Sequence, residues 1–268
     1  MKKKISVLLA AVMTASCFCA CGSSSSASGT ASSDAAAKSA ASDITTVEEG
    51  SLIMATNAAF PPYEYYDGDD IVGIDVEIAQ AIADKLGLEL VVNDMDFGSI
   101  ISTVQDGQAD IGAAGITVTD DRLENVDFSD SYATGVQVIV VRDDSDITSA
   151  DDLKGRTIGV QENTTGYLYC ERDYGGENVS SFSKGIDAIA ALKSGEIDSV
   201  VIDNEPAKAF VRANDGLKIL DTAYVTEEYA IAVSKDNEAL LDAVNKAMHE
   251  MKADGSLQDI IDAHINTK

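Results

Sequence analysis

Residues 113–122, Ala-Ala-Gly-Ile-Thr-Val-Thr-Asp-Asp-Arg, place one arginine just after a short apolar segment, a pattern that could bind a carboxylate. Gly115 lets a ligand approach the main chain, and Thr117 supplies a hydroxyl group. The planar guanidinium of Arg122 can form two parallel charge-assisted hydrogen bonds with a carboxylate, which a lysine cannot do. The segment therefore indicates a carboxylate receptor; a surface loop with a solvated arginine is the alternative.

A charged group of opposite sign follows another apolar segment. Asp203 comes directly after residues 200–202, Val-Val-Ile, and could bind a cation. Because buried charges need partners of opposite sign, a strand-end aspartate and a cleft arginine together suit a zwitterion. The alternative is that Arg122 and Asp203 pair with each other or with water.

The sequence lacks the common catalytic and nucleotide-binding motifs. It has no zincin motif, phosphate-binding Gly-Lys-Ser, dinucleotide glycine fingerprint or Gly-x-Ser-x-Gly elbow. His249 and His264 have no ligand partners at metal-binding spacing, and the acids in residues 67–70 fit a hairpin turn, because a calcium loop needs a distal glutamate. We therefore expect no cofactor, no metal and no ATP hydrolysis by this chain.

The chain is strongly acidic. It has 19 Lys and Arg against 46 Asp and Glu, a net charge of −27. Such a surface repels nucleic acid and anionic lipid headgroups, so we exclude binding to either. Of the four cysteines only Cys170 lies outside the first 21 residues, so we expect no disulfide framework and a buried, inert thiol.

The N-terminus is typical of an exported lipoprotein. Residues 1–20 combine three lysines with an apolar core too short to span a bilayer, as in a signal peptide. Residues 18–22, Phe-Cys-Ala-Cys-Gly, resemble a bacterial lipobox with two less usual residues at its start, so Cys21 is the expected lipidation site. An ordinary secretory signal is the alternative. Residues 21–50 should form a flexible tether, because residues 22–43 contain 16 Ser or Ala and no bulky apolar side chain.

Beyond the tether, strand and helix patterns alternate, which predicts an α/β fold. Asp75 is an expected helix cap, Gly87 an expected helix end, and Ser149 to Asp152 an expected capping box. The expected strands are residues 51–56, 63–66, 71–74, 88–92, 109–114, 157–160, 178–182 and 199–202, and the expected helices are residues 75–86, 97–105, 165–171, 186–193, 237–252 and a last short one after Gly255.

Two helix–strand units repeat at an offset of 88 residues. Gly107 aligns with Gly195, and Gly115 aligns with Asp203. Ligands of open α/β sheets bind at the carboxyl ends of the strands, so two such units suggest two lobes that face one another. Chance similarity between two generic α/β units is the alternative. The β-rich residues 137–142 and 229–233 could then be two crossover strands between the lobes.

Several ordered motifs lie between residues 51 and 265. They are Ala-Thr-Asn-Ala-Ala-Phe-Pro-Pro-Tyr-Glu-Tyr at 55–65, Val-Gly-Ile-Asp-Val-Glu at 72–77, Met-Asp-Phe at 95–97, Gly-Ile-Thr-Val-Thr-Asp-Asp-Arg-Leu-Glu-Asn-Val-Asp-Phe-Ser at 115–129, Thr-Thr-Gly at 164–166, and Ala-Asp-Gly-Ser-Leu at 253–257. Together they resemble the polar amino-acid-binding proteins of bacterial ABC importers, solute-binding family 3. The resemblance implies a two-lobed periplasmic-binding-protein fold of type II with two hinge crossover strands, divided into lobe 1 (residues 51–139), lobe 2 (residues 140–228) and a C-terminal part of lobe 1 (residues 229–268).

The resemblance also implies a role for individual residues. Arg122 would bind the ligand α-carboxylate and Asp203 the α-ammonium. The expected helpers at the carboxylate are the Gly115 backbone, Thr117 and Thr165, and the expected residues around the ligand side chain are Phe60, Phe97, Asn57, Gln161 and Ile202.

This sequence departs from the family pattern at two informative places. Asn57 stands where many relatives with basic or amide ligands carry Asp, and Glu162-Asn163 replaces a glycine-bearing loop. We therefore expect a neutral polar amino acid as the ligand. The resemblance implies a monomeric, lipid-anchored receptor outside the cytoplasm, which closes over one free L-amino acid and delivers it to an ABC permease with a separate ATPase. The alternatives to this non-enzymatic role are a sensor module and a dehydratase-like enzyme with Glu162 as its acid.

Overall fold

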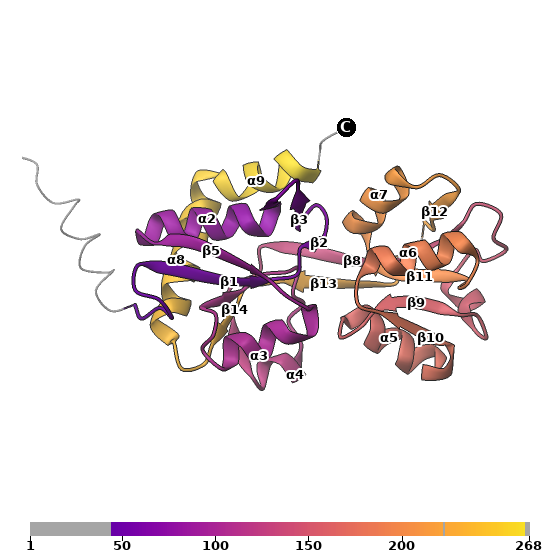
Figure 1. The fold of residues 1–268 in the computed structure, drawn as a ribbon, viewed down its shortest axis with the longest axis horizontal. Helices are drawn as coiled ribbons and strands as arrows, with labels where there is room; N and C mark the ends of the chain where they lie inside the picture. The colour runs from indigo at the N-terminus through magenta and orange to yellow at the C-terminus, as the bar shows by residue number, and fades with distance from the viewer. Residues whose placement is uncertain (1–43, 222, 266–268) are drawn as a thin grey trace, which may run out of the picture.

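The computed structural model describes residues 44–221 and 223–265, which form two lobes side by side (Figure 1). Lobe 1 is a five-stranded sheet in the order β5-β1-β6-β14-β7, and lobe 2 is a sheet in the order β10-β9-β11-β8-β12 with β13 paired to β8. The predicted signal peptide and Cys21, and the tether as far as residue 43, lie outside the described residues. No helix in the described part of the chain is long and apolar enough to cross a membrane.

Lobe 1 holds both ends of the described chain and carries helices on both faces of its sheet (Figure 1). A small antiparallel sheet of β2, β3 and β4 packs beside it. Its strands are β1 (Ser51–Thr56), β2 (Ala59–Phe60), β3 (Glu64–Asp67), β4 (Asp70–Val72), β5 (Glu89–Asp94), β6 (Ile111–Gly112), β7 (Val126–Phe128) and β14 (Ala232–Ser234), and its helices are α2 (Ile74–Leu86), η1 (Phe97–Ser99), α3 (Ile100–Gln105), α4 (Asp120–Leu123), α8 (Glu238–Asp254) and α9 (Ser256–Ile265).

Lobe 2 is built in the same way, with α6 and α7 on one face of its sheet and α5 on the other (Figure 1). Its strands are β8 (Ala133–Arg142), β9 (Ile158–Gln161), β10 (Val179–Phe182), β11 (Ser199–Asp203), β12 (Leu217–Ile219) and β13 (Val225–Tyr229), and its helices are η2 (Ala150–Leu153), α5 (Thr165–Tyr174), η3 (Gly176–Asn178), α6 (Gly185–Ser194) and α7 (Asn204–Ala213).

Two neighbouring segments connect the lobes. The antiparallel strands β8 and β13 pair Ala133 with Tyr229, and the Tyr132 N–H donates to the Tyr229 carbonyl at 2.9 Å. The whole of β8 belongs to the lobe 2 sheet, so a division of the chain between residues 139 and 140 would cut this strand. The first crossover therefore lies earlier than the sequence pattern suggests, because one continuous β-rich run supplies both the crossover and a central strand.

Most of the expected elements are present, and a few differ locally. Gly87 ends α2 in the left-handed conformation, and the Ser149 capping box forms, although it begins a short 3₁₀ helix. Asp75 is not a cap: α2 begins one residue earlier, and the Asp75 carboxyl points into the protein and accepts from the Gly115 N–H at 2.8 Å. The strand expected at residues 109–114 is reduced to the two residues of β6.

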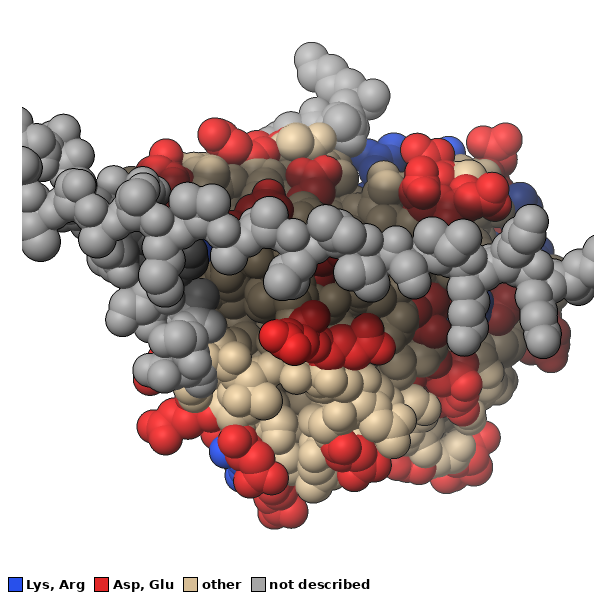
Figure 2. All heavy atoms as spheres, turned by 60° about the vertical axis from the view of Figure 1, so that its left-hand side comes forward, with Lys and Arg blue, Asp and Glu red and all other residues tan. Residues whose placement is uncertain are grey.

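Acidic side chains cover the described surface, as the composition predicts. On the face in Figure 2, Asp and Glu side chains are far more numerous than Lys and Arg. Cys170 is fully buried in lobe 2, which confirms the expected burial. Burial also raises the pKa of its thiol to about 12, which disfavours the reactive thiolate.

Candidate binding cleft between the lobes

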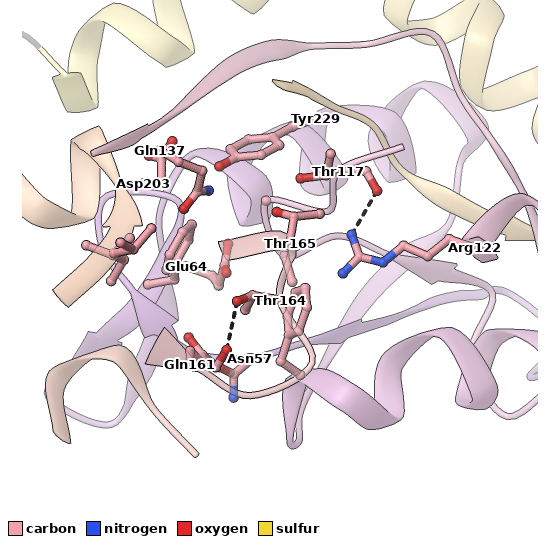
Figure 3. A pocket seen from close by; sticks show the side chains of 16 residues that line it. Asn57, Glu64, Thr117, Arg122, Gln137, Gln161, Thr164, Thr165, Asp203 and Tyr229 are labelled. Atoms are coloured by element: carbon pink, nitrogen blue, oxygen red, sulfur yellow. Dashed lines mark hydrogen bonds between the residues drawn. The ribbon is translucent and has the colours of Figure 1, made fainter. Parts of the chain in front are cut away.

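A single cleft brings together all ten predicted ligand-binding residues. It encloses about 480 Å³ of space between atoms, with its mouth included. Both lobes contribute to its walls (Figure 3). The predicted residues that line it are Asn57, Phe60, Phe97, Gly115, Thr117, Arg122, Gln161, Thr165, Ile202 and Asp203. Residues up to 146 positions apart in the chain, from Asn57 to Asp203, therefore meet at one place.

Arg122 lies on α4, a helix of lobe 1 that Thr119 caps through a hydrogen bond from the Arg122 N–H. Its guanidinium donates to the Thr117 carbonyl at 2.8 Å and, across the cleft, to the Asn163 carbonyl at 3.2 Å. It lies 5.3 Å from the centre of the Phe97 ring. Burial lowers the pKa of Arg122, yet a guanidinium keeps its proton in proteins, and donors remain for a carboxylate.

Lobe 2 presents a second group that suits an anion at this end of the cleft. Thr165 is the first residue of the ten-residue helix α5, and Thr164 caps this helix by accepting from the Tyr167 N–H at 3.3 Å. Both threonines line the cleft. Unpaired N–H groups and the helix dipole favour a negative charge near the start of a helix, so both lobes can hold one carboxylate.

Asp203 ends β11 and caps α7 at the lobe 2 wall. Its side chain is 1% exposed and accepts from the Val136 N–H at 2.8 Å and the Glu205 N–H at 3.0 Å. Burial raises the pKa of Asp203 to about 6, while these bonds and one from Tyr229 oppose the rise. Asp203 and Arg122 have different partners and do not pair with each other. A buried carboxyl of this kind would be stabilised by an ammonium group.

The expected role of Gly115 needs a correction. Its N–H already donates to the buried Asp75 carboxyl, at 2.8 Å, so it is not free to bind a ligand carboxylate. Gly115 has a φ of 54°, a left-handed conformation that favours glycine.

The far end of the cleft is formed by two amide side chains from opposite lobes. Gln161 donates to the Asn57 side-chain oxygen at 3.0 Å, and Asn57 donates to the Met95 carbonyl at 2.7 Å. Phe60 stacks on Tyr63 with 5.8 Å between ring centres and packs against the cores of both lobes. This end therefore offers flat apolar surface and amide oxygens.

Six residues of the cleft were not predicted from the sequence. Tyr229 donates to Asp203, and Gln137 donates to the buried Glu227 carboxylate at 3.0 Å. Glu64 is 1% exposed and lies within the quoted motif at 55–65, but no periodicity marks its carboxyl as buried. The six are Glu64, Ala114, Gln137, Thr164, Val201 and Tyr229.

The unusual Glu162-Asn163 pair has a simple structural explanation. Asn163 has a φ of 63°, a left-handed conformation that Asn tolerates better than most residues, so it replaces the expected glycine without displacing Thr165. Glu162 is exposed and does not line the cleft, so the acid suspected for a dehydratase lies outside it. The two histidines contact carboxylates: His249 contacts Asp130 at 2.6 Å, and His264 contacts Glu77 at 2.8 Å.

Two similar lobes around one cleft, with a guanidinium on one wall and a carboxylate on the other, define a two-lobed ligand-binding protein of the type II periplasmic class. The family model for bacterial extracellular solute-binding proteins, family 3, matches residues 52–267, and the chain belongs to this family. Its members are solute-binding proteins and not enzymes.

Known proteins with related sequences bind amino acids. The arginine-binding extracellular protein ArtP of Bacillus subtilis (strain 168) is 40% identical over 217 residues, 78% of this chain and 84% of the relative. The L-cystine-binding protein TcyJ of Escherichia coli (strain K12) is 32% identical over 216 residues, 79% of this chain and 81% of the relative. A solved structure of an ancestral arginine-binding protein bound to glutamine matches with a TM-score of 0.78 at 40% identity, and covers 82% of this chain and 100% of that chain.

Proposed function

We propose that this chain binds free L-arginine in its cleft, as a monomer anchored outside the cytoplasm through Cys21, and delivers it to an ABC permease with a separate ATPase. Family membership and the relatives support amino-acid binding outside the cytoplasm in ABC import. The observation that carries the proposal is that Arg122 and Asp203 line one cleft from different lobes and do not pair with each other. That arrangement suits the carboxylate and ammonium groups of one amino acid.

The choice of arginine differs from the expectation of a neutral polar ligand, which the comparisons do not confirm. Two of the three similar proteins named above are arginine-binding, one of them in a structure bound to glutamine, and the third is cystine-binding. The neutral-ligand expectation depended on Asn57 having no charge, whereas the cleft contains another acid, Glu64, within its wall. The aromatic rings of Phe60 and Phe97 can also stack on a guanidinium.

Two hydrogen bonds that join the lobes across the cleft support closure around the ligand. Gln161 of lobe 2 donates to Asn57 of lobe 1, and Arg122 of lobe 1 donates to the Asn163 carbonyl of lobe 2. Closure by hinge motion is favoured only by as much as the ligand binds the closed form better. A ligand that contacts both walls meets this condition.

Isothermal titration calorimetry on the mature protein with arginine, lysine, histidine, glutamine and cystine tests the proposal. We expect arginine to bind at least about tenfold more tightly than glutamine, a difference of about 1.4 kcal/mol. Tighter binding of glutamine than arginine would restore the neutral polar ligand, and no binding of any amino acid would overturn the function. For the anchor, Cys21→Ser should move the protein from the membrane fraction to the soluble fraction.

A further inference from the structure

Two buried carboxyl groups lie side by side beneath the wall of the cleft. Glu64 lines the cleft, and Asp75 lies behind it on α2; each is 1% exposed. One oxygen of Asp75 accepts from the Gly115 N–H at 2.8 Å and the Tyr132 hydroxyl at 2.7 Å. If both groups are counted as ionised, the other Asp75 oxygen and both Glu64 oxygens have no hydrogen-bond donor.

A single proton on one of the two carboxyl groups removes the repulsion between them and supplies a hydrogen-bond donor. Two adjacent carboxylates without a cation repel each other in a low-dielectric interior, whereas one protonated group can donate to the other. A hydrogen bond between the two side chains raises the pKa of Glu64 and lowers that of Asp75, which identifies Glu64 as the donor. Burial is the largest cause of the raised Glu64 pKa. The wall of the cleft therefore holds a neutral acid.

The groups around Glu64 do not supply a positive charge. Besides Asp75, the titratable groups that interact electrostatically with the Glu64 carboxyl are Asp94 at the end of β5 and the hydroxyls of Tyr63 and Tyr132. Asp94 accepts from the Ala58 N–H at 2.8 Å, next to Asn57 at the amide end of the cleft. All of these groups are acidic or neutral. The Arg122 guanidinium also lines the cleft, but the Thr117 and Asn163 carbonyls hold it apart from Glu64 (Figure 3). Among the described residues around Glu64 no cation pairs with it, so a cationic ligand would supply one from the cleft side.

We propose that Glu64 detects the charge of the ligand side chain: it keeps its proton in the empty cleft and with neutral ligands, and releases it to solvent when a cationic side chain binds. The proposal rests on the proposed function, since arginine is the expected cation. In the release step the Glu64 O–H bond breaks, the proton passes to buffer, and the guanidinium replaces it as the partner of the carboxylate. A neutral amide cannot compensate a second carboxylate, so it leaves the proton in place.

Calorimetry of the mature protein at pH 7 in phosphate and in Tris tests this, because the heat of buffer ionisation reports the number of protons released. L-arginine and L-citrulline are the probes, since citrulline has nearly the shape of arginine without its charge. We expect arginine to release about one proton and citrulline almost none. Asp203 adds about a tenth of a proton for either ligand, because its pKa of about 6 leaves it mostly ionised at pH 7.

Glu64→Gln is the matched variant, because the amide has the shape of a protonated carboxyl and can still donate to Asp75. In this variant arginine should release almost no proton and bind at least about tenfold more weakly, while citrulline affinity should change less than about threefold. Glu162→Gln removes an exposed acid outside the cleft and should leave the number of released protons unchanged.

Equal proton release by arginine in the wild type and in Glu64→Gln overturns the role of Glu64 but leaves arginine binding intact. Absence of arginine binding overturns both proposals.

Discussion

The two lobes share one sheet design but present different chemistry to the cleft. The central strands follow the same pattern of parallel and antiparallel pairs, β5-β1-β6-β14 in lobe 1 and β10-β9-β11-β8 in lobe 2. Asp110 and Asp198, which are also 88 positions apart, make matching contacts: Asp110 accepts from the Ile53 N–H at 2.7 Å, and Asp198 accepts from the Thr157 N–H at 2.9 Å. The offset of 88 residues therefore reflects a structural repeat and not chance.

The difference arises where the repeated strands end. In lobe 1 the chain passes Gly115, whose N–H is held by Asp75, and reaches Arg122 only on the following short helix. In lobe 2 the strand ends in Asp203 itself, which is buried and held by two backbone N–H groups. Similar scaffolds thus carry opposite charges, and they suit a ligand that carries a carboxylate and an ammonium group.

Loss of the lobe 2 carboxylate should have the largest effect on binding. Asp203→Asn keeps the size of the side chain and can keep one of its two backbone hydrogen bonds through the amide oxygen, but it removes the charge that would pair with the ligand ammonium. We expect a loss of about 3–5 kcal/mol, roughly 10² to 10⁴ in affinity. Titration calorimetry measures it, and Asp187→Asn, an exposed residue of α6, is the control. Affinity within about threefold of the wild type would remove Asp203 from the site.

Loss of the lobe 1 cation should have a smaller effect, because the start of α5 also faces the ligand carboxylate. We expect Arg122→Ala to weaken binding about 10²-fold, close to 3 kcal/mol. Arg156→Ala, which removes an arginine paired with Asp146 on the lobe 2 surface, should bind normally. If Arg122→Ala lost no more than Arg156→Ala, the carboxylate would have to be held by lobe 2 alone.

Acidification should weaken ligand binding and change stability through protonation of Asp203 in lobe 2. Burial raises the pKa of Asp203 to about 6, so below pH 6 a proton competes with the ligand ammonium, and affinity should fall about tenfold per pH unit. Because this pKa is raised above its unfolded value, the contribution of Asp203 to the stability of the empty protein is full below about pH 4 and is lost as the pH rises through 6. Thermal melts from pH 3 to 8 should show the stability difference between wild type and Asp203→Asn changing between about pH 4 and 6 and staying constant on either side. A pH-independent affinity for a neutral ligand would contradict the assignment.

The smallest expected effect concerns the contact between Gly98 of lobe 1 and Asn163 of lobe 2. A Cβ atom on Gly98 of lobe 1 would lie 2.5 Å from the Asn163 side-chain nitrogen of lobe 2. Gly98→Ala should therefore hinder closure and weaken binding several-fold, about 1 kcal/mol, since the end of a flexible side chain can move. The double variant Gly98→Ala with Asn163→Gly should regain affinity in calorimetry. Without this recovery, Asn163 would not be the obstructing group.

Local patterns predicted much of the fold and the polar ends of the site. The periodicity of α2, the glycine at its end and the hairpin turn at residues 67–70 depend on neighbours in the chain, so they are visible in the sequence. Motif resemblance located Arg122 and Asp203, which line one cleft. The local helix pattern assigned Asp75 to a helix cap, and the resemblance assigned the Gly115 backbone to a ligand, because a hydrogen bond between residues 40 positions apart has no local signal.

The amino-acid sequence by itself determined the alternation of helices and strands, the repeat, and the charged groups available at the strand ends, because these follow from side-chain type and spacing. Only the tertiary structure decided which groups are already satisfied and which remain for a ligand. Burial and long-range contacts make this decision: they hold the Gly115 N–H against Asp75, place Glu64 in the cleft wall and raise the pKa of Asp203.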